Sequence, residues 1–411
     1  MEKALGINFW IFRISQVITA LGYSASSIAA MWWVLGEYHK MIYVSFLVVP
    51  PLVISALSQP FAAPAGDRYD KKKLIITGLG MQLISYFIVA TILFSGEMNI
   101  AFFIAFEILS TFGKIIFNTG SIGIIPCLVP SDKITDGMNI THRINSTMSI
   151  LGGVFGGGLV TFFGTAYSFA FLTTCIAIST FLCFFMKYKK EVGSVSKTSK
   201  WLDDIKEGFN YTVNNKVVFG FFMYSLVIGL SFAPMLIAFP YLIKEINGLP
   251  ALFAGLLATS MGLGVICGSF IYPFACKVID SKNLVYVSSF LFFLALLMIG
   301  TFHNVAFVFA GQFIIGLSRN WINVTIDSLL LIHLPSHLRT RVLSNLSFFA
   351  MINMPLAMMI SGFLMDTLGV YNIMLALSAV CFIAMLLITT DKMVRKFLSA
   401  DPDEAKALLK D

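Results

Sequence analysis

The sequence predicts an all-α integral membrane protein in which twelve transmembrane helices form two pseudo-symmetric six-helix bundles. Of its 411 residues, 58% are hydrophobic and 12% are charged, and the mean hydropathy is +0.86. Soluble domains carry about twice this share of charge, ~25%. Twelve segments are long enough to cross a bilayer, and two of them share a spaced polar pattern. A water-soluble enzyme is excluded, because so little polar surface cannot keep such a chain dispersed.

Each predicted span meets the ~20 mainly apolar residues that a helix needs to cross the hydrocarbon core. In chain order the spans are Phe9–Gly36, Met41–Ala63, Leu74–Ser95, Asn99–Leu128, Ile144–Thr165, Ser168–Met186, Val217–Pro240, Ala251–Cys276, Leu284–Phe302, Val305–Ile332, Leu343–Met365 and Tyr371–Thr390. The first is longer than the ~7–15 apolar residues of a signal peptide, so no cleavable signal is expected.

The basic residues predict the orientation of the spans. Of the 28 Lys and Arg, 24 fall at one face, only Lys40 and Lys244 fall in the opposite loops, and Lys114 and Arg319 fall inside spans. Because cytoplasmic loops carry the excess of Lys and Arg, both termini are expected to be cytoplasmic. The cations flank spans rather than gathering on one polar face, so the net charge of +7 does not indicate a nucleic-acid partner.

The longest hydrophilic stretch predicts the division into domains. The N-terminal bundle, the linker, the C-terminal bundle and a cytoplasmic tail are expected at residues 1–186, 187–216, 217–390 and 391–411. Four apolar residues recur in the linker with helical spacing, which indicates an amphipathic helix on the membrane surface. They are Trp201, Ile205, Phe209 and Val213.

An internal repeat supports two related bundles. Residues of the fourth span recur 205 positions later in the tenth span: Lys114 as Arg319, Asn118 as Asn323, and Leu128-Val129-Pro130-Ser131 as His333-Leu334-Pro335-Ser336. On the same offset, Glu107 corresponds to Gln312. Parallel repeats of this kind are found in one large class of transporters.

Several chemistries are not indicated. The six cysteines lie in or beside apolar stretches without a CxxC pair, so neither a disulfide framework nor a metal site is expected. No GxxxxGK[ST] sequence occurs, so the chain is not expected to hydrolyse ATP. We expect no cofactor and no enzymatic activity.

The loop between the second and third spans carries a family signature. Its sequence APAGDRYDKKK, residues 63–73, resembles the GxxxDRxGRR/K motif of the major facilitator superfamily, at the same location. The matching positions are Asp67, Arg68, Lys71 and Lys72, whereas Ala63 and Asp70 replace glycines. The resemblance implies the major facilitator fold and transport by alternating access. An acid in this turn can accept hydrogen bonds from the exposed N–H groups at the start of a neighbouring helix. It would thereby latch the two halves in one conformation of the transport cycle.

Shorter motifs resemble those of bacterial macrolide and siderophore (enterobactin-type) exporters, and together they cover nearly the whole chain. They are Phe9-Trp10, Gln16, Gly22, Leu128-Val129-Pro130, Glu207-Gly208, Asn215-Lys216 and Leu338–Val342. Where drug exporters of this group often carry an arginine in the fourth span, this chain has Ser110, with Lys114 the nearest cation. The resemblance implies a multi-pass protein of the bacterial inner membrane.

The fifth span resembles the antiporter motif GPxxGG, with Gly153 in place of the proline. The glycines concerned are Gly152, Gly153, Gly156 and Gly157. Small residues at this spacing let helices approach closely, so plain packing explains them as well as a role in antiport does. Gly264 and Gly268 offer a comparable surface in the eighth span.

Ionisable residues inside spans are costly and usually line a cavity or meet a partner. Lys114 and Arg319 each lie ~21 Å along their helix from its outer end, so they share one depth. In the family that this chain resembles, the first, fourth, seventh and tenth helices line the central path. The predicted substrate-binding residues are Lys114, Arg319, Asn118, Asn323, Gln16, Tyr23, Tyr224 and Trp321. Interhelical hydrogen bonding is the alternative role for the two cations.

Glu107 is the only acid well inside an N-terminal span, and it is the candidate proton-carrying carboxyl. The alternative is that Glu107, near the outer leaflet, snorkels to the membrane surface or makes a structural hydrogen bond. Glu107 and Lys114 lie within ~20° on one helix face but ~10 Å apart along it, so no contact between them is expected. Asp327 is expected to be structural, pairing with cations at the inner gate.

The sequence therefore predicts a proton-coupled exporter of an amphiphilic, anionic natural product, drug or siderophore. It is expected to act as a monomer in the bilayer, with protons and a small-molecule substrate as its partners. An importer of an anionic nutrient or metal–siderophore chelate is the alternative with the same fold. A membrane enzyme for lipid-linked substrates would need polar residues that the short outer loops lack, and nothing in the sequence indicates a sensor.

Overall fold

The computed structural model describes residues 6–129, 133–187, 209–334, 336–400, 404 and 408–409. Regular structure in these residues is helical throughout, which confirms the all-α class. Eleven helices of this part are long and apolar enough to cross a membrane. One of them, Arg143–Phe185, contains both the fifth and the sixth predicted span, broken at Gly164 (φ 86°, ψ 179°). Glycine adopts this positive φ without steric cost, so two spans follow each other with almost no loop.

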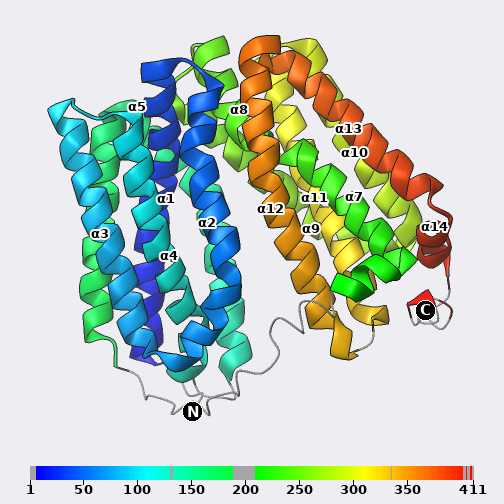
Figure 1. Ribbon diagram of the computed structural model, residues 1–411, viewed down its shortest axis with the longest axis horizontal. Helices are drawn as coiled ribbons and strands as arrows, with labels where there is room; N and C mark the ends of the chain where they lie inside the picture. Colours follow the sequence, from blue (N-terminus) through cyan, green and yellow to red (C-terminus); the bar gives the residue numbers. More distant parts are fainter. Residues whose placement is uncertain are drawn as a thin grey trace. The chain divides into compact units, whose positions relative to one another are not determined.

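Two compact units divide the chain, one of Met1–Lys197 with Pro240–Thr259 and one of Thr198–Phe239 with Ser260–Asp411. The helices before the linker are α1 (Ile7–Tyr38), α2 (Met41–Arg68), α3 (Lys71–Ser95), α4 (Ile100–Leu128) and α5 (Ile134–Phe185). In the first unit α1 packs along α5, and α4 packs against α2 and α3 (Figure 1).

The helices after the linker are α7 (Lys216–Phe232), α8 (Met235–Tyr241), the π-helix η2 (Leu242–Ile246), α9 (Ala251–Val278), α10 (Ser281–Phe302), α11 (Val305–His333), α12 (Ser336–Leu368), α13 (Val370–Thr390) and α14 (Lys392–Ser399). In the second unit α10 packs against α11 and α13, and α7 packs against α12 and α13. The segment Pro240–Thr259, which the sequence assigns to the C-terminal bundle, groups with the first unit.

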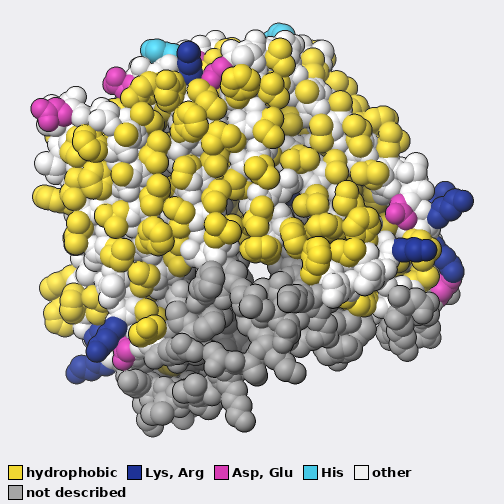
Figure 2. Space-filling view, viewed as in Figure 1, with side chains coloured by type: hydrophobic (Ala, Val, Ile, Leu, Met, Phe, Trp, Pro, Cys, Tyr) yellow, Lys and Arg dark blue, Asp and Glu magenta, His cyan; other side chains and the backbone are white. Residues whose placement is uncertain are grey.

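The surface of the helices is suited to lipid. Large apolar side chains such as Phe162 and Phe270 are about three-quarters exposed, at 74% and 75%. Figure 2 shows hydrophobic side chains over most of the described face, with charged ones at its margins. Ser and Thr hydroxyls inside the helices bond to carbonyls one turn back, as Thr173 does to Phe169 at 2.8 Å. Such bonds satisfy polar groups where no water is present.

Helices α4 and α11 extend the internal repeat from sequence to structure. Both contain 29 residues, and each boundary of α11 lies 205 positions after that of α4. Their N-caps are also equivalent: Asn99 accepts from Phe102 N at 3.0 Å, and Asn304 accepts from Ala306 N at 2.9 Å. A capping asparagine satisfies a helix-start N–H that would otherwise have no partner.

The signature loop joins α2 to α3 within the first unit. Asp70, one of its two departures from the family pattern, is the N-cap of α3 and accepts from Lys73 N at 3.1 Å. Lys71 donates to Cys127 Sγ at 3.3 Å, and Lys72 donates to the Phe184 carbonyl at 2.7 Å, near the end of α5. The two lysines thus connect α3 to the neighbouring helix ends.

Several predicted features lie outside the described residues or side chains. Residues 209–214 are helical and contain the last two apolar positions of the predicted amphipathic helix. The features outside the description are residues Pro130, Ser131, Trp201, Ile205, Glu207, Gly208 and Pro335, and the side chains of Asp67, Arg68 and residues 338–341. The latch role of Asp67 therefore stays a prediction.

Candidate functional site

The first unit contains a cavity of about 440 Å³ lined by α1, α2, α3 and α4. Its polar lining residues include four of those predicted from the sequence, Tyr23, Glu107, Lys114 and Asn118. The remaining walls are mostly apolar, with Met31, Leu47, Pro51 and Phe117 among them. Among its described lining residues, the cavity therefore combines an apolar wall with one pair of opposite charges.

The expectation that Glu107 and Lys114 do not touch is wrong. Lys114 Nζ lies 4.0 Å from Glu107 Oε2, at the outer limit of an ion pair. Helical side chains lean toward the N-terminus, so the long Lys114 chain reaches back along the helix toward Glu107. The lysine side chain is 37% exposed and the glutamate 15%. Both ends of the pair thus belong to the cavity lining.

Aromatic rings and hydroxyls surround this pair. Lys114 Nζ lies 5.1 Å from the Tyr23 ring centroid and 5.5 Å from that of Tyr86, distances at which a ring face attracts a cation. Ser110 Oγ is 3.0 Å from the Tyr86 hydroxyl and 3.3 Å from Glu107 Oε2. Sequence reasoning missed Tyr86 and Gln82, whose amide oxygen accepts from the Tyr23 hydroxyl. Their four-residue spacing on an otherwise apolar span was the available signal.

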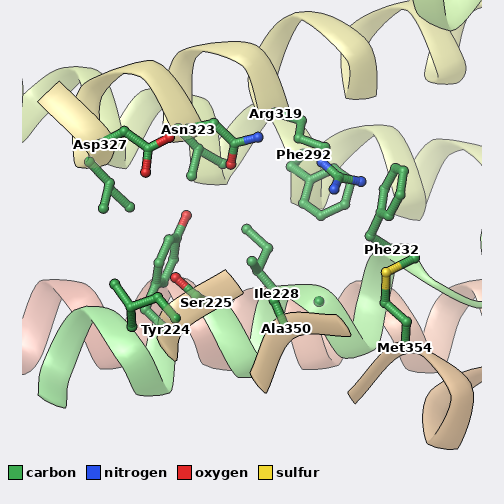
Figure 3. Close-up of a pocket in the computed structure, with 14 residues that line it drawn as sticks. Tyr224, Ser225, Ile228, Phe232, Phe292, Arg319, Asn323, Asp327, Ala350 and Met354 are labelled. Carbon is green, nitrogen blue, oxygen red and sulfur yellow. The ribbon is translucent and has the colours of Figure 1, made fainter. Parts of the chain in front are cut away.

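The second unit contains a separate cavity of about 270 Å³ lined by α7, α10, α11 and α12. Figure 3 shows Arg319, Asn323 and Asp327 of α11 on one side and Tyr224, Ser225 and Ile228 of α7 on the other. The Tyr224 hydroxyl lies 2.7 Å from Ser289 Oγ of α10. Three predicted substrate-binding residues, Arg319, Asn323 and Tyr224, therefore share one cavity.

Arg319 contacts an aromatic ring and has no acidic partner among the residues that the structure describes. Its Cζ lies 3.3 Å from the centroid of the Phe232 ring, and its Nη1 atom is buried with no hydrogen-bond partner. Within the described part of the chain, no carboxylate oxygen lies within 4.0 Å of it. Sequence reasoning missed Phe232, because an aromatic residue in an apolar span carries no signal of its own. Among the described residues, the guanidinium at the cavity wall therefore faces an aromatic ring and no carboxylate.

Asp327 lines the same cavity as Arg319. It lies two turns beyond Arg319 on α11, and among the described side chains no Lys or Arg nitrogen lies within 4.0 Å of its carboxylate. The expected pairing with cations at an inner gate is therefore not found in this part of the chain. Asp327 becomes a second carboxyl with access to a cavity.

Two other predicted substrate residues are engaged elsewhere. Gln16 accepts from Arg13 Nη1 and donates to Ser121 Oγ at 3.0 Å, and it does not line the cavity beside Lys114. Trp321 donates its indole N–H to the Gly268 carbonyl at 2.8 Å, so it joins α11 to α9. Arg13, assigned to the inner face from sequence, is a buried residue of α1 that is only 2% exposed.

The glycines of α5 lie at close contacts with two neighbouring segments. A β-carbon on Gly152 or Gly156 would overlap Ser24 of α1. On the adjacent face, a β-carbon on Gly153 or Gly157 would meet the carbonyl oxygens of Gly255 and Ala251, both 2.6 Å away. Gly264 and Gly268 likewise pack against Phe313 and Leu317 of α11. These glycines therefore allow close packing of the helices, whereas their role in antiport stays a prediction.

Substituting Gly153 by Ala is expected to lower the thermal stability of the purified protein, by about 1–3 kcal/mol of unfolding free energy. The new methyl would stand 2.6 Å from a backbone oxygen, so α5 and the start of α9 must separate. Gly158→Ala is the matched control, because its methyl would meet only Leu252 at 3.9 Å. Equal melting temperatures for the two variants would contradict this account of the contact.

Comparison with known proteins places the chain among membrane transporters. The family described as "transmembrane secretion effector" matches residues 6–408. A staphyloferrin A transporter of Staphylococcus aureus (strain NCTC 8325 / PS 47) is 25% identical over 319 residues, covering 76% of this chain and 79% of the relative.

Solved transporter structures share the fold. A bacterial homologue of the iron transporter ferroportin, in an inward-facing state, has a TM-score of 0.73 at 12% identity, covering 94% of this chain and 99% of that one. The nucleoside transporter NupG has a TM-score of 0.73 at 11% identity, with coverage of 94% and 99%. A bacterial homologue of the lysosomal transporter Spinster also has 0.73 at 11%, with coverage of 96% and 98%. At these identities the likeness shows the fold alone.

Proposed function

We propose that this chain, which belongs to the transmembrane secretion effector family and is a membrane transporter of the major facilitator type, exports an anionic, siderophore-like natural product in exchange for protons. The observation that carries the proposal is the guanidinium of Arg319, which has no acidic partner among the described residues and lies at a cavity wall. The proposed location is the bacterial inner membrane, where the protein acts as a monomer.

The energetics of Arg319 favour an anionic substrate. Removing a cation from water costs several kcal/mol, and a desolvated contact with one aromatic ring returns about 2 kcal/mol. An arginine without a countercharge is therefore incompletely stabilised by the surroundings that the structure describes. A carboxylate, phosphate or catecholate group of the substrate would supply the countercharge, because the planar guanidinium can bind two oxygens at once.

The Glu107–Lys114 pair offers a way to couple protons to substrate. At 4.0 Å the pair is long, and both groups line the cavity of the first unit. Protonation of Glu107 would release Lys114 to bind a substrate anion, and loss of the proton would recapture Lys114 and favour release. Proton binding at Glu107 and substrate binding at Lys114 would then be linked through one ion pair. We propose Glu107 as the coupling carboxyl on this ground.

The substrate class and the direction draw support from the relatives. The family is described by secretion, which favours export over import. The curated relative transports staphyloferrin A, a siderophore, which is consistent with an anionic ligand beside Arg319. Import of an anionic nutrient or metal–siderophore chelate is the second candidate, because cavity cations suit an anion moving in either direction.

A flux assay in inside-out membrane vesicles tests both direction and substrate charge. With an acid interior, vesicles containing the protein are expected to accumulate a carboxylate or catecholate siderophore and to leave a hydrophobic cation of similar size outside. Collapse of the pH gradient is expected to stop accumulation. Accumulation by right-side-out vesicles alone would indicate import, and preference for the cation would contradict the role given to Arg319.

A further inference from the structure

A basic groove lies on the second unit, at the end of α10 and α14 that the charge pattern predicts to be cytoplasmic. It has a volume of about 520 Å³ and is lined by Lys282, Lys392, Arg395, Lys396, Ser399, Ala400 and Glu404. Figure 2 shows dark-blue side chains at the right edge of the view, where Figure 1 places α14. Neither substrate cavity shares a lining residue with the groove.

Helix α14 holds three of these cations in place. Asp391 caps the helix, accepting from Met393 N at 2.8 Å and Val394 N at 3.1 Å. Val394, Phe397 and Leu398 are buried in the apolar core of the second unit, at most 7% exposed. Because these residues anchor one face of the helix, Lys392, Arg395 and Lys396 are presented on the other.

The groove carries an excess of positive charge. Lys396 pairs with Glu404 at 3.2 Å. Lys282, Lys392 and Arg395 have no acid within 4.0 Å among the described residues. The carboxylate of Asp391 is already engaged by the backbone of its own helix. These three cations of the groove are therefore available to bind a ligand.

An apolar surface adjoins the groove along the same helices. Both α10 and α13 pack against α14 as well as against each other. Their exposed side chains include Val287 and Phe290 on α10 and Ile383 and Leu387 on α13, which are 40–51% exposed. Phe293 and Phe382 bridge the two helices with ring centroids 5.3 Å apart. Exposed apolar side chains of α10 thus begin within two turns of Lys282, and those of α13 lie on the helix that packs beside it.

We propose that this groove binds the headgroup of an anionic phospholipid, with the acyl chains lying along the exposed face of α10 and α13. Phosphate oxygens accept charge-assisted hydrogen bonds from Lys and from the fork of Arg395. A soluble anion would account for the cations alone, whereas a lipid accounts for the cations and the apolar face together. The site also lies where juxtamembrane basic clusters meet anionic headgroups.

Native mass spectrometry of the full-length protein tests the proposal, with cardiolipin, phosphatidylglycerol and phosphatidylcholine of matched acyl chains. We expect one anionic lipid to be retained at a single saturable site and the zwitterionic lipid to be lost. The variant Lys282→Gln/Arg395→Gln is expected to bind the anionic lipid about 30-fold more weakly, from ~1 kcal/mol per basic residue. Both side chains are at least partly exposed, so its melting temperature should stay unchanged.

The control variant Lys216→Gln/Lys277→Gln removes two positive charges from the same predicted membrane face outside the groove. It is expected to bind the lipid as the unmodified protein does. Equal weakening in both double variants would mean general attraction to a basic surface, and would overturn the proposal. Competition by millimolar inorganic phosphate, or equal retention of phosphatidylcholine, would also overturn it, in favour of a free-anion site or of apolar contact alone.

Discussion

Replacing Arg319 by Gln is expected to lower the affinity for an anionic substrate by about 100-fold, because a buried charge pair that loses one partner costs ~2–5 kcal/mol. The amide keeps a donor but loses both the charge and the fork. Insertion and folding should be preserved, since no acid among the described residues depends on this guanidinium. Binding is measured by the quenching of protein fluorescence on titration with a carboxylate siderophore, and transport by flux in proteoliposomes.

Two further variants separate the charge of Arg319 from its geometry. Arg319→Lys keeps the charge without the planar fork, so an intermediate affinity is expected. Arg13→Gln makes the same chemical change at another buried arginine, which lines neither cavity, and transport should be retained. Full transport by Arg319→Gln at normal expression would contradict substrate contact at this residue. Equal loss in Arg13→Gln would point to a general need for buried cations.

Replacing Glu107 by Gln is expected to uncouple transport from protons. The amide cannot carry a proton through the cycle, so accumulation against a gradient should fall to the level of vesicles without a pH difference. Exchange of labelled for unlabelled substrate should continue, because the cavity keeps Lys114, Tyr23 and Asn118. The measurement compares gradient-driven uptake with counterflow in the same proteoliposomes.

The variant Asp327→Asn is the control for Glu107→Gln. Asp327 is the acid of the other cavity, and the described part of the chain shows no cation paired with it. If Glu107 is the coupling group, the Asp327 variant should still respond to the pH gradient. Loss of coupling in Asp327→Asn with coupling retained in Glu107→Gln would transfer the role to the second cavity.

The two cavities show how a repeated sequence produces sites with different charges. Lys114 and Arg319 occupy equivalent positions in α4 and α11, as do Asn118 and Asn323. Their acids are not equivalent: Glu107 precedes Lys114 by two turns, whereas Asp327 follows Arg319 by about two turns. As a result, Lys114 has a carboxylate oxygen at 4.0 Å beside its two aromatic rings, whereas Arg319 faces an aromatic ring and has no carboxylate within 4.0 Å among the described residues. We therefore expect the two cavities to respond differently to the loss of their acids.

The sequence by itself determined the membrane class, the all-α fold and most helix boundaries. The length of an apolar segment and the turn residues that end it are local properties of the sequence. For this reason α4 and α11 begin and end within about one residue of the predicted spans. It also singled out Lys114, Glu107 and Arg319, because charge is rare in a span and therefore conspicuous. The same argument cannot detect Phe232, which looks like an ordinary apolar residue until it lies beside a cation.

Only the tertiary structure decided which residues share a cavity and which are used in packing. Gln16 and Trp321 have the right residue type and depth, but their hydrogen bonds to Ser121 and Gly268 engage them in interhelical contacts. The pairing of Lys114 with Glu107 depended on side-chain direction, which a helical wheel does not represent. A side chain's role in a bilayer depends on the neighbours that satisfy it, and those neighbours come from helices distant in the sequence.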